Sequence, residues 1–101
     1  MTLSWRAQLA HGRDLVEVAD ARIITALRGQ DMVGYAQGLV DRAAGERVVA
    51  DAWELAGGPC GQANATFWRG AAAEDTARAA VTVQEIDRAG VERLWGRGRA
   101  A

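Results

Sequence analysis

Apolar side chains recur at steps of three and four residues along most of this chain. The pattern runs through residues 3–56 and again through 64–95, and a glycine-rich segment containing the single proline, Pro59, separates the two stretches. Steps of three and four place apolar side chains on one face of an α-helix. The β-branched clusters are too short to outweigh this period. We therefore predict an all-α protein.

Short polar residues and glycines mark the expected helix ends. Ser4 or Thr2 is a candidate N-cap for the first helix, which the pattern predicts as one helix bent at Gly12 or as two helices with Asp14 capping the second. Gly29 is expected to end this segment, and Asp31 is expected to cap the next one.

Two further breaks are expected downstream. Gly45 is a candidate interruption of the next helical stretch. The run Gly57-Gly58-Pro59-Cys60-Gly61 predicts a Gly-rich loop at 57–63, after which Asn64 or Thr66 would cap the last helix. Together these boundaries predict a small bundle of about four helices.

The length and composition indicate one domain. A chain of 101 residues is long enough for one modest core, so we expect a single helical domain over 1–95. The last residues are rich in arginine and glycine, which predicts a flexible tail over 96–101. Alanine is abundant, and small residues allow helices to approach closely.

The inventory of reactive side chains excludes several kinds of chemistry. All twelve basic residues are arginine, so a phosphate-binding loop that needs lysine and a Schiff-base mechanism are both excluded. The chain has one cysteine and one histidine, so we expect no metal site within a monomer and no cofactor. Arg42 and Glu46 are four residues apart and are expected to form an ion pair on a solvated helix face.

The sequence shows neither the pattern of a secretory signal nor that of a membrane-spanning helix. Arg6 and Arg13 are not followed by the apolar core of a secretory signal, and no run of about 18 apolar residues is long enough to span a bilayer. The expected location is therefore the cytoplasm, with no membrane partner.

The candidate partner-binding residues come from two patterns in the apolar positions. A stripe on the last helix offers Val83, Ile86 and Leu94. Gly34 and Gly38 lie one helical turn apart, which predicts a close approach by another helix.

The adjacent aromatic pair Phe67-Trp68 is a further candidate for partner binding. Because it adjoins the glycine-rich segment, the pair is either a lid over the core, which we favour, or an exposed anchor for a partner.

A catalytic set is difficult to assemble from this sequence. His11 and Asp14 are three residues apart and form one candidate acid–base pair, and Cys60 is a candidate nucleophile beside Pro59. A small enzyme that uses either of these is one alternative function.

The tail suggests a second alternative. Arg97 and Arg99 flank a glycine, an arrangement that resembles arginine hooks in the DNA minor groove. The balance of twelve basic and thirteen acidic residues gives no overall attraction to nucleic acid, so a DNA-binding regulator is not favoured.

The leading hypothesis is a non-enzymatic helical module for protein–protein interaction, such as an adaptor, an accessory subunit or a mobile-element protein. It would act by self-association or by binding to a larger assembly, and its expected partner is a second copy or another protein.

Overall fold

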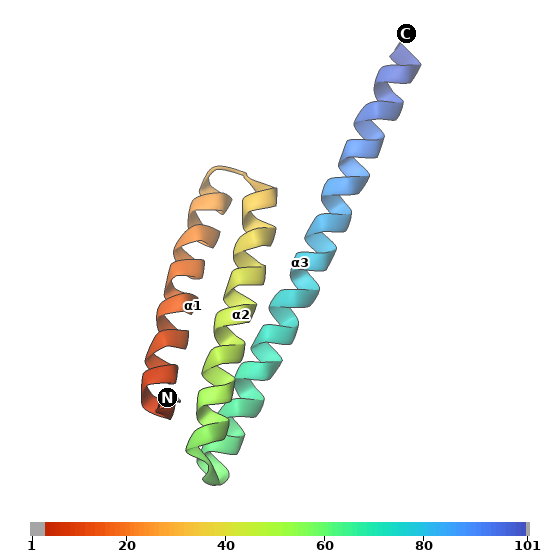
Figure 1. Cartoon of the computed structure of the whole chain (residues 1–101). Helices are drawn as coiled ribbons and strands as arrows, with labels where there is room; N and C mark the ends of the chain where they lie inside the picture. Colours follow the sequence, from red (N-terminus) through yellow and green to blue (C-terminus); the bar gives the residue numbers. More distant parts are fainter. Residues whose placement is uncertain (1–3, 101) are drawn as a thin grey trace.

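The protein is a bundle of three long helices. The computed structural model describes residues 4–100, and within that range it describes all side chains except those of 91 and 94–100. The helices are α1 (Trp5–Arg28), α2 (Met32–Ala56) and α3 (Gly58–Ala100), and α2 packs against both of the others (Figure 1). The predicted all-α class is confirmed, but the prediction of about four helices is wrong.

The expected breaks at Gly12 and Gly45 do not occur, because both glycines serve the packing of α1 against α2. A Cβ atom at Gly12 would lie 2.8 Å from Val49 Cγ2, and one at Gly45 would lie 3.0 Å from the backbone nitrogen of Val16. Both distances are too short for carbon in van der Waals contact, so only glycine permits this separation. Asp14 accordingly lies inside α1 and caps no second helix.

The predicted ends of the first helices are confirmed. The Ser4 hydroxyl accepts a hydrogen bond from the Ala7 N–H at 3.1 Å, and the Asp31 carboxylate accepts one from the Gly34 N–H at 2.9 Å. Each satisfies an N–H that has no partner in the first turn of a helix. Gly29 follows the last residue of α1 as expected. Thr2, the other candidate cap, lies outside the described residues.

The predicted Gly-rich loop at 57–63 is wrong, because Gly57 alone separates α2 from α3. The chain reverses through Gly57 and Gly58, whose φ angles of 76° and 71° lie in the left-handed region that glycine tolerates. Pro59 falls in the first turn of α3, where its missing N–H removes no helical hydrogen bond.

Asn64 and Thr66, expected as caps, lie within α3. The Asn64 side-chain amide donates to the Cys60 carbonyl at 2.9 Å, and the Thr66 hydroxyl donates to the Gln62 carbonyl at 3.0 Å. Both side chains thus bond back to the preceding turn of their own helix.

Two apolar clusters form the core, and each draws on all three helices. One is built around Leu9, Val49 and Ala52, with Trp5, Val16, Trp53 and Trp68 packed against it; the other is built around Ile23, Leu39 and Ala79, with Tyr35 packed against it. The rings of Trp5 and Trp53 are 5.8 Å apart between centroids. Large side chains at one end therefore compensate for the many alanines elsewhere in the bundle.

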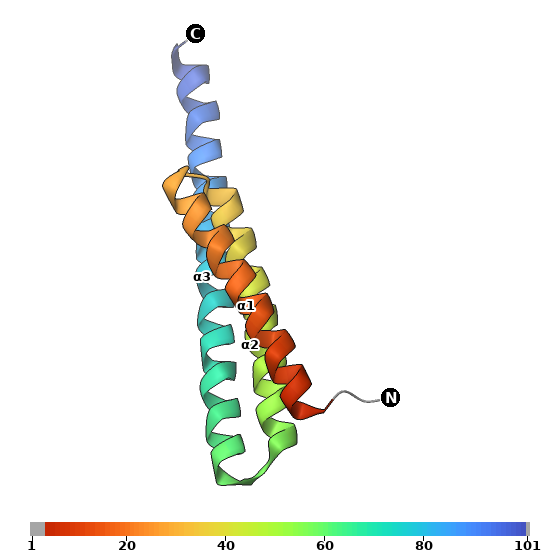
Figure 2. The same cartoon turned by 90° about the vertical axis from the view of Figure 1, so that its left-hand side faces the viewer.

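The molecule is elongated, because α3 is much longer than its neighbours. Its principal extents are 65 × 24 × 22 Å. The C-terminal part of α3 continues past the turn between α1 and α2, as both views show (Figures 1 and 2).

The side of α3 that faces the bundle repeats every seven residues. Buried or half-buried positions follow one another in alternating steps of four and three along the helix: Gly61, Ala65, Trp68, Ala72, Asp75, Ala79, Thr82 and Ile86. This spacing is that of a helix packed along one continuous seam.

Candidate functional site

A charged layer crosses the bundle between the two apolar clusters. Arg42 of α2 donates from Nε and Nη2 to the two carboxylate oxygens of Asp75 on α3, at 2.8 Å each. Its Nη1 donates at 3.0 Å to Oδ1 of Asp20 on α1. One guanidinium thus joins all three helices, with the bidentate geometry that binds a carboxylate most firmly.

Glu46, one turn along α2 from Arg42, is the most buried member of this layer. It is 5% exposed, and its Oε1 has no hydrogen-bond partner. Burial, and then a hydrogen bond with Asp75, raise the pKa of Glu46 to about 8. The carboxyl is therefore mainly protonated at neutral pH, which avoids a second negative charge beside Asp75.

The Arg42 guanidinium lowers the pKa of the Asp75 carboxyl. Its hydrogen bonds hold the pKa of Asp75 below its ordinary value. Arg42 and Asp75 therefore stay charged while Glu46 stays neutral, so two neighbouring carboxyls have different protonation states.

This layer has the ingredients of acid–base chemistry. Among the grooves that residues of the described part line, four follow the helix junctions, and the linings of these four include neither Arg42, Glu46 nor Asp75. What the geometry does provide is alignment, because a polar layer in an apolar core matches only one relative position of the helices.

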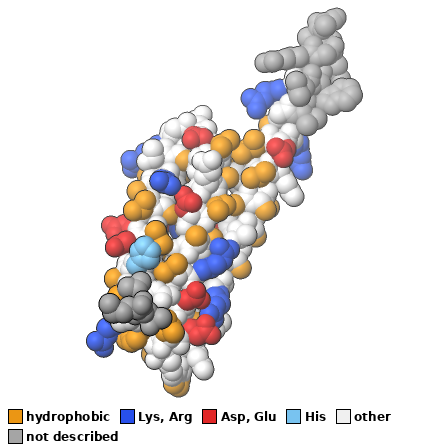
Figure 3. Space-filling view, in the orientation of Figure 1, with side chains coloured by type: hydrophobic (Ala, Val, Ile, Leu, Met, Phe, Trp, Pro, Cys, Tyr) orange, Lys and Arg blue, Asp and Glu red, His pale blue; other side chains and the backbone are white. Residues whose placement is uncertain are grey.

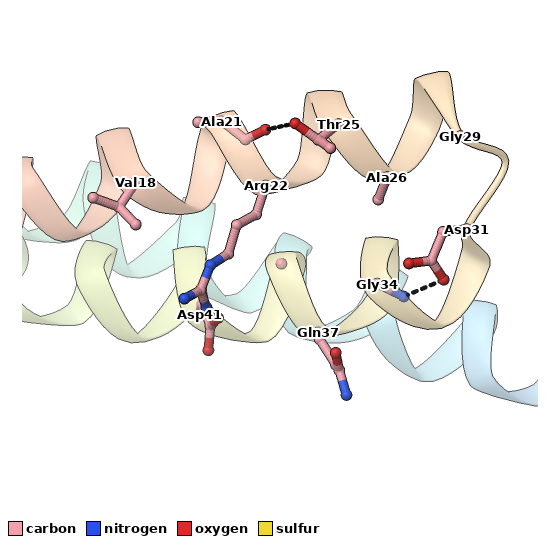
Figure 4. A pocket seen from close by; sticks show the side chains of 11 residues that line it. Val18, Ala21, Arg22, Thr25, Ala26, Gly29, Asp31, Gly34, Gln37 and Asp41 are labelled. Carbon is pink, nitrogen blue, oxygen red and sulfur yellow. Dashed lines mark hydrogen bonds and ion pairs between the residues drawn. The ribbon is translucent and has the colours of Figure 1, made fainter.

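The largest of these four grooves lies between α1 and α2 and has a volume of about 1000 Å³ (Figure 4). Arg22 spans it to pair with Asp41 at 2.8 Å. The Thr25 hydroxyl donates to its own helix, and Asp31 is occupied as the cap of α2. Arg22 and Asp41 are thus paired with each other, while Thr25 and Asp31 bond to the backbone of their own helices.

A second groove, between α2 and α3, is apolar. It has a volume of about 430 Å³, and alanines and valines make up most of its lining. Val40 and Val83, one from each helix, line it and are 55% and 47% exposed. Hydrophobic side chains also appear between the charged ones over much of the face in Figure 3. The bundle therefore leaves large apolar side chains in contact with water.

The two members of the predicted aromatic pair have different surroundings. Trp68 packs against the first apolar cluster, whereas Phe67 is 66% exposed. The two rings meet edge to face with centroids 5.5 Å apart. Trp68 thus covers the core, and Phe67 presents an aromatic ring to solvent.

The predicted stripe on the last helix has a different register. Ile86 is half-buried and lines a groove with the start of α2, but Val83 lies beside the buried seam, which instead passes through Thr82. The prediction of Val83 came from its spacing of four residues after Ala79 and three before Ile86, whereas the buried seam continues from Ala79 by three residues to Thr82 and then by four to Ile86. The side chain of Leu94 lies outside the described residues.

Gly34 and Gly38 lie on the α1 side of α2. A Cβ atom at Gly38 would lie 2.7 Å from Ile23 Cγ1, so the predicted close approach at this glycine is confirmed, and it is made within the chain. Gly34 faces Ala26 of α1 and its own cap, Asp31. Both glycines line the largest groove, so their assignment to a partner surface stays a prediction.

The remaining candidates are distributed over the surface. His11 and Asp14 are exposed on α1, and Cys60 is an exposed free thiol in the first turn of α3. Arg97 and Arg99 belong to the helical backbone of α3, and their side chains lie outside the described part. The flexible tail over 96–101 and its DNA-binding arginines therefore stay predictions.

The sequence reasoning missed the charged layer. Arg42 and Glu46 were expected to form a solvated pair, but Glu46 is buried and Arg42 pairs with Asp75 and Asp20. A signal was present on α3, where the seven-residue spacing places Asp75 among positions that are otherwise mostly apolar.

In comparisons with models of known families, with curated proteins and with solved structures, no match was found. Within residues 4–100, no helix contains a stretch apolar enough over the required length to cross a bilayer. The described side chains also include no cluster of three or more His, Cys, Asp or Glu residues suited to a metal ion.

Proposed function

We propose that the protein is a helical interaction module that acts by self-association through the outer surface of its bundle, as a subunit of a homo-oligomer or of a larger assembly. The observation that carries the proposal is the exposure of large apolar side chains on all three helices, among them Val18, Val40, Leu55 and Phe67. Exposed apolar area of this kind is typical of surfaces that bind another protein.

The architecture supports this proposal. Helix α2 contacts both neighbours, and α3 continues past the turn between α1 and α2 (Figure 1). This arrangement leaves long helix faces of the described part without an intramolecular partner. Burying apolar area of this kind is worth about 25 cal/mol for each Å² removed from water, which favours association of such faces.

The test is the mass of the protein in solution as a function of concentration, measured by sedimentation equilibrium. We expect a dimer or a larger homo-oligomer to form by high micromolar concentration. A protein that stays monomeric at several hundred micromolar would contradict self-association.

The apolar surface can be tested in the same experiment. Val40→Glu and Val83→Glu place charge at exposed positions, so the fold should remain intact. If the α2–α3 groove is part of the contact between copies, each substitution should weaken association about tenfold or more. Glu17→Gln, on an exposed part of α1, is the matched control and should leave the mass distribution unchanged.

A further inference from the structure

One exposed stripe of α3 has an ordered charge pattern. It consists of Phe67, Glu74, Val81 and Arg88, which follow one another in steps of seven residues; we call it the outer stripe. Residues seven apart lie on nearly the same side of a helix.

The outer stripe is accessible along its whole length. Its members follow Ala65, Ala72, Ala79 and Ile86 of the buried seam by two residues, about 200° around the helix, and the first three precede Trp68, Asp75 and Thr82 by one residue, about 100°. All four members are exposed, and Val81, at its centre, is 52% exposed.

The charges of the stripe have no partner inside the described part of the chain. The ion pairs there join other residues, and neither Glu74 nor Arg88 takes part in one. With respect to the described side chains, both are therefore available to pair with another molecule.

The pattern is self-complementary about Val81. Glu74 lies seven residues before it and Arg88 seven residues after it. If two copies of α3 are placed antiparallel with a two-fold axis at Val81, Glu74 of each copy faces Arg88 of the other. A parallel arrangement in register would instead place Glu74 against Glu74 and Arg88 against Arg88, which is repulsive.

Flanking residues follow the same symmetry. Arg78 lies three residues before Val81 and Glu85 lies four residues after it, so an antiparallel pair also brings these opposite charges near each other. Both are exposed.

We propose that two copies of the chain associate along the outer stripe of α3, antiparallel, with the two-fold axis at Val81. This inference rests on the proposed self-association and names the surface and the orientation that achieve it. From position 74 to position 88 the contact would extend over roughly 21 Å at 1.5 Å per residue.

Charge reversal tests the surface by sedimentation velocity. Glu74→Arg and Arg88→Glu each replace both intermolecular ion pairs with like-charge contacts, so each should weaken dimerisation at least tenfold. The double variant Glu74→Arg/Arg88→Glu restores opposite charges and should return the dissociation constant to within about threefold of the wild type. Asp87→Arg, an exposed change off the stripe, is the matched control and should have little effect.

The outcomes separate this inference from the broader proposal. If the wild type stays monomeric, both are overturned. If it associates but the single charge reversals leave the affinity unchanged, or the double variant fails to recover it, only the outer stripe is overturned. Circular dichroism and thermal unfolding at monomeric concentration establish that each variant is folded.

Disulfide formation tests the orientation. In a Cys60→Ser background, Val81→Cys should form an intermolecular disulfide in oxidised glutathione, because the two thiols meet at the axis. Phe67→Cys should not, because an antiparallel pair separates those thiols by roughly 42 Å. Efficient cross-linking through position 67 would show a parallel pair and overturn the proposal.

Discussion

Arg42 connects all three helices, and the carboxyl groups beside it differ in protonation. It binds Asp75 through two hydrogen bonds and Asp20 through a third. Glu46 lies beside this pair and is buried, so it keeps its proton at neutral pH. The residue with the least solvent contact in the layer is thus the one whose charge changes near physiological pH.

The stability of the bundle should depend on the titration of Glu46. The folded chain holds this proton to about pH 8, whereas an unfolded chain releases it near pH 4.5. The folded state therefore binds more protons between these values, and the free energy of unfolding should fall as pH rises through this window. Asp75, with its lowered pKa, has the opposite effect only at more acidic pH.

Glu46→Gln removes this titration while retaining the shape of the side chain. Between pH 5 and pH 8 the wild type should lose about 1–3 kcal/mol more stability than the variant, as measured by urea unfolding at monomeric concentration. Glu17→Gln is the control, since Glu17 is exposed. Equal pH dependence in the wild type and Glu46→Gln would contradict this role of Glu46.

The helices combine two kinds of glycine, which differ in what surrounds them. At Gly12 of α1 a methyl group would meet the backbone and side chain of Val49 on α2, whereas at Gly70 of α3 nothing lies within 4 Å of the same position. Intrinsic helix propensity favours alanine over glycine at both sites by about 1 kcal/mol. Only the neighbouring helix makes the two sites unequal.

Replacing each glycine by alanine should separate packing from propensity. Gly70→Ala should stabilise the protein by up to about 1 kcal/mol. Gly12→Ala should destabilise it by about 1–3 kcal/mol, because a Cβ 2.9 Å from the Val49 backbone nitrogen forces α1 and α2 apart. Chemical unfolding measures both, and a Gly12→Ala protein as stable as Gly70→Ala would contradict the close approach.

At the scale of the whole molecule, the length of α3 determines the shape. The Cα radius of gyration is 17.9 Å, compared with about 13 Å for a compact chain of about a hundred residues. The excess comes from the part of α3 that extends beyond α1 and α2 (Figure 2).

Small-angle X-ray scattering should detect this extension. At concentrations where the protein is monomeric, we expect a radius of gyration near 18 Å. A value near 13 Å would show that the end of α3 folds back onto the bundle. Glu74→Arg, which is designed to weaken association, provides a second monomeric sample with the same expected shape.

The sequence by itself determined the features that depend on neighbouring residues. The helical class follows from the apolar period, and Ser4 and Asp31 cap their helices because a short polar side chain reaches an N–H three residues on. The reversal near Pro59 was also visible, although its length was overestimated because a proline suits the first turn of a helix as well as a loop.

Only the tertiary structure decided the features that depend on a facing helix. Gly12 and Gly45 resemble helix breaks until α1 and α2 are placed side by side. Arg42 and Glu46 have the spacing of a solvated pair, and the same spacing occurs inside a bundle. In the structure Glu46 is buried and Arg42 is half-buried, where α3 supplies Asp75 and α1 supplies Asp20 as partners of the guanidinium. The free energy of a charged side chain depends on such partners, which are distant in sequence.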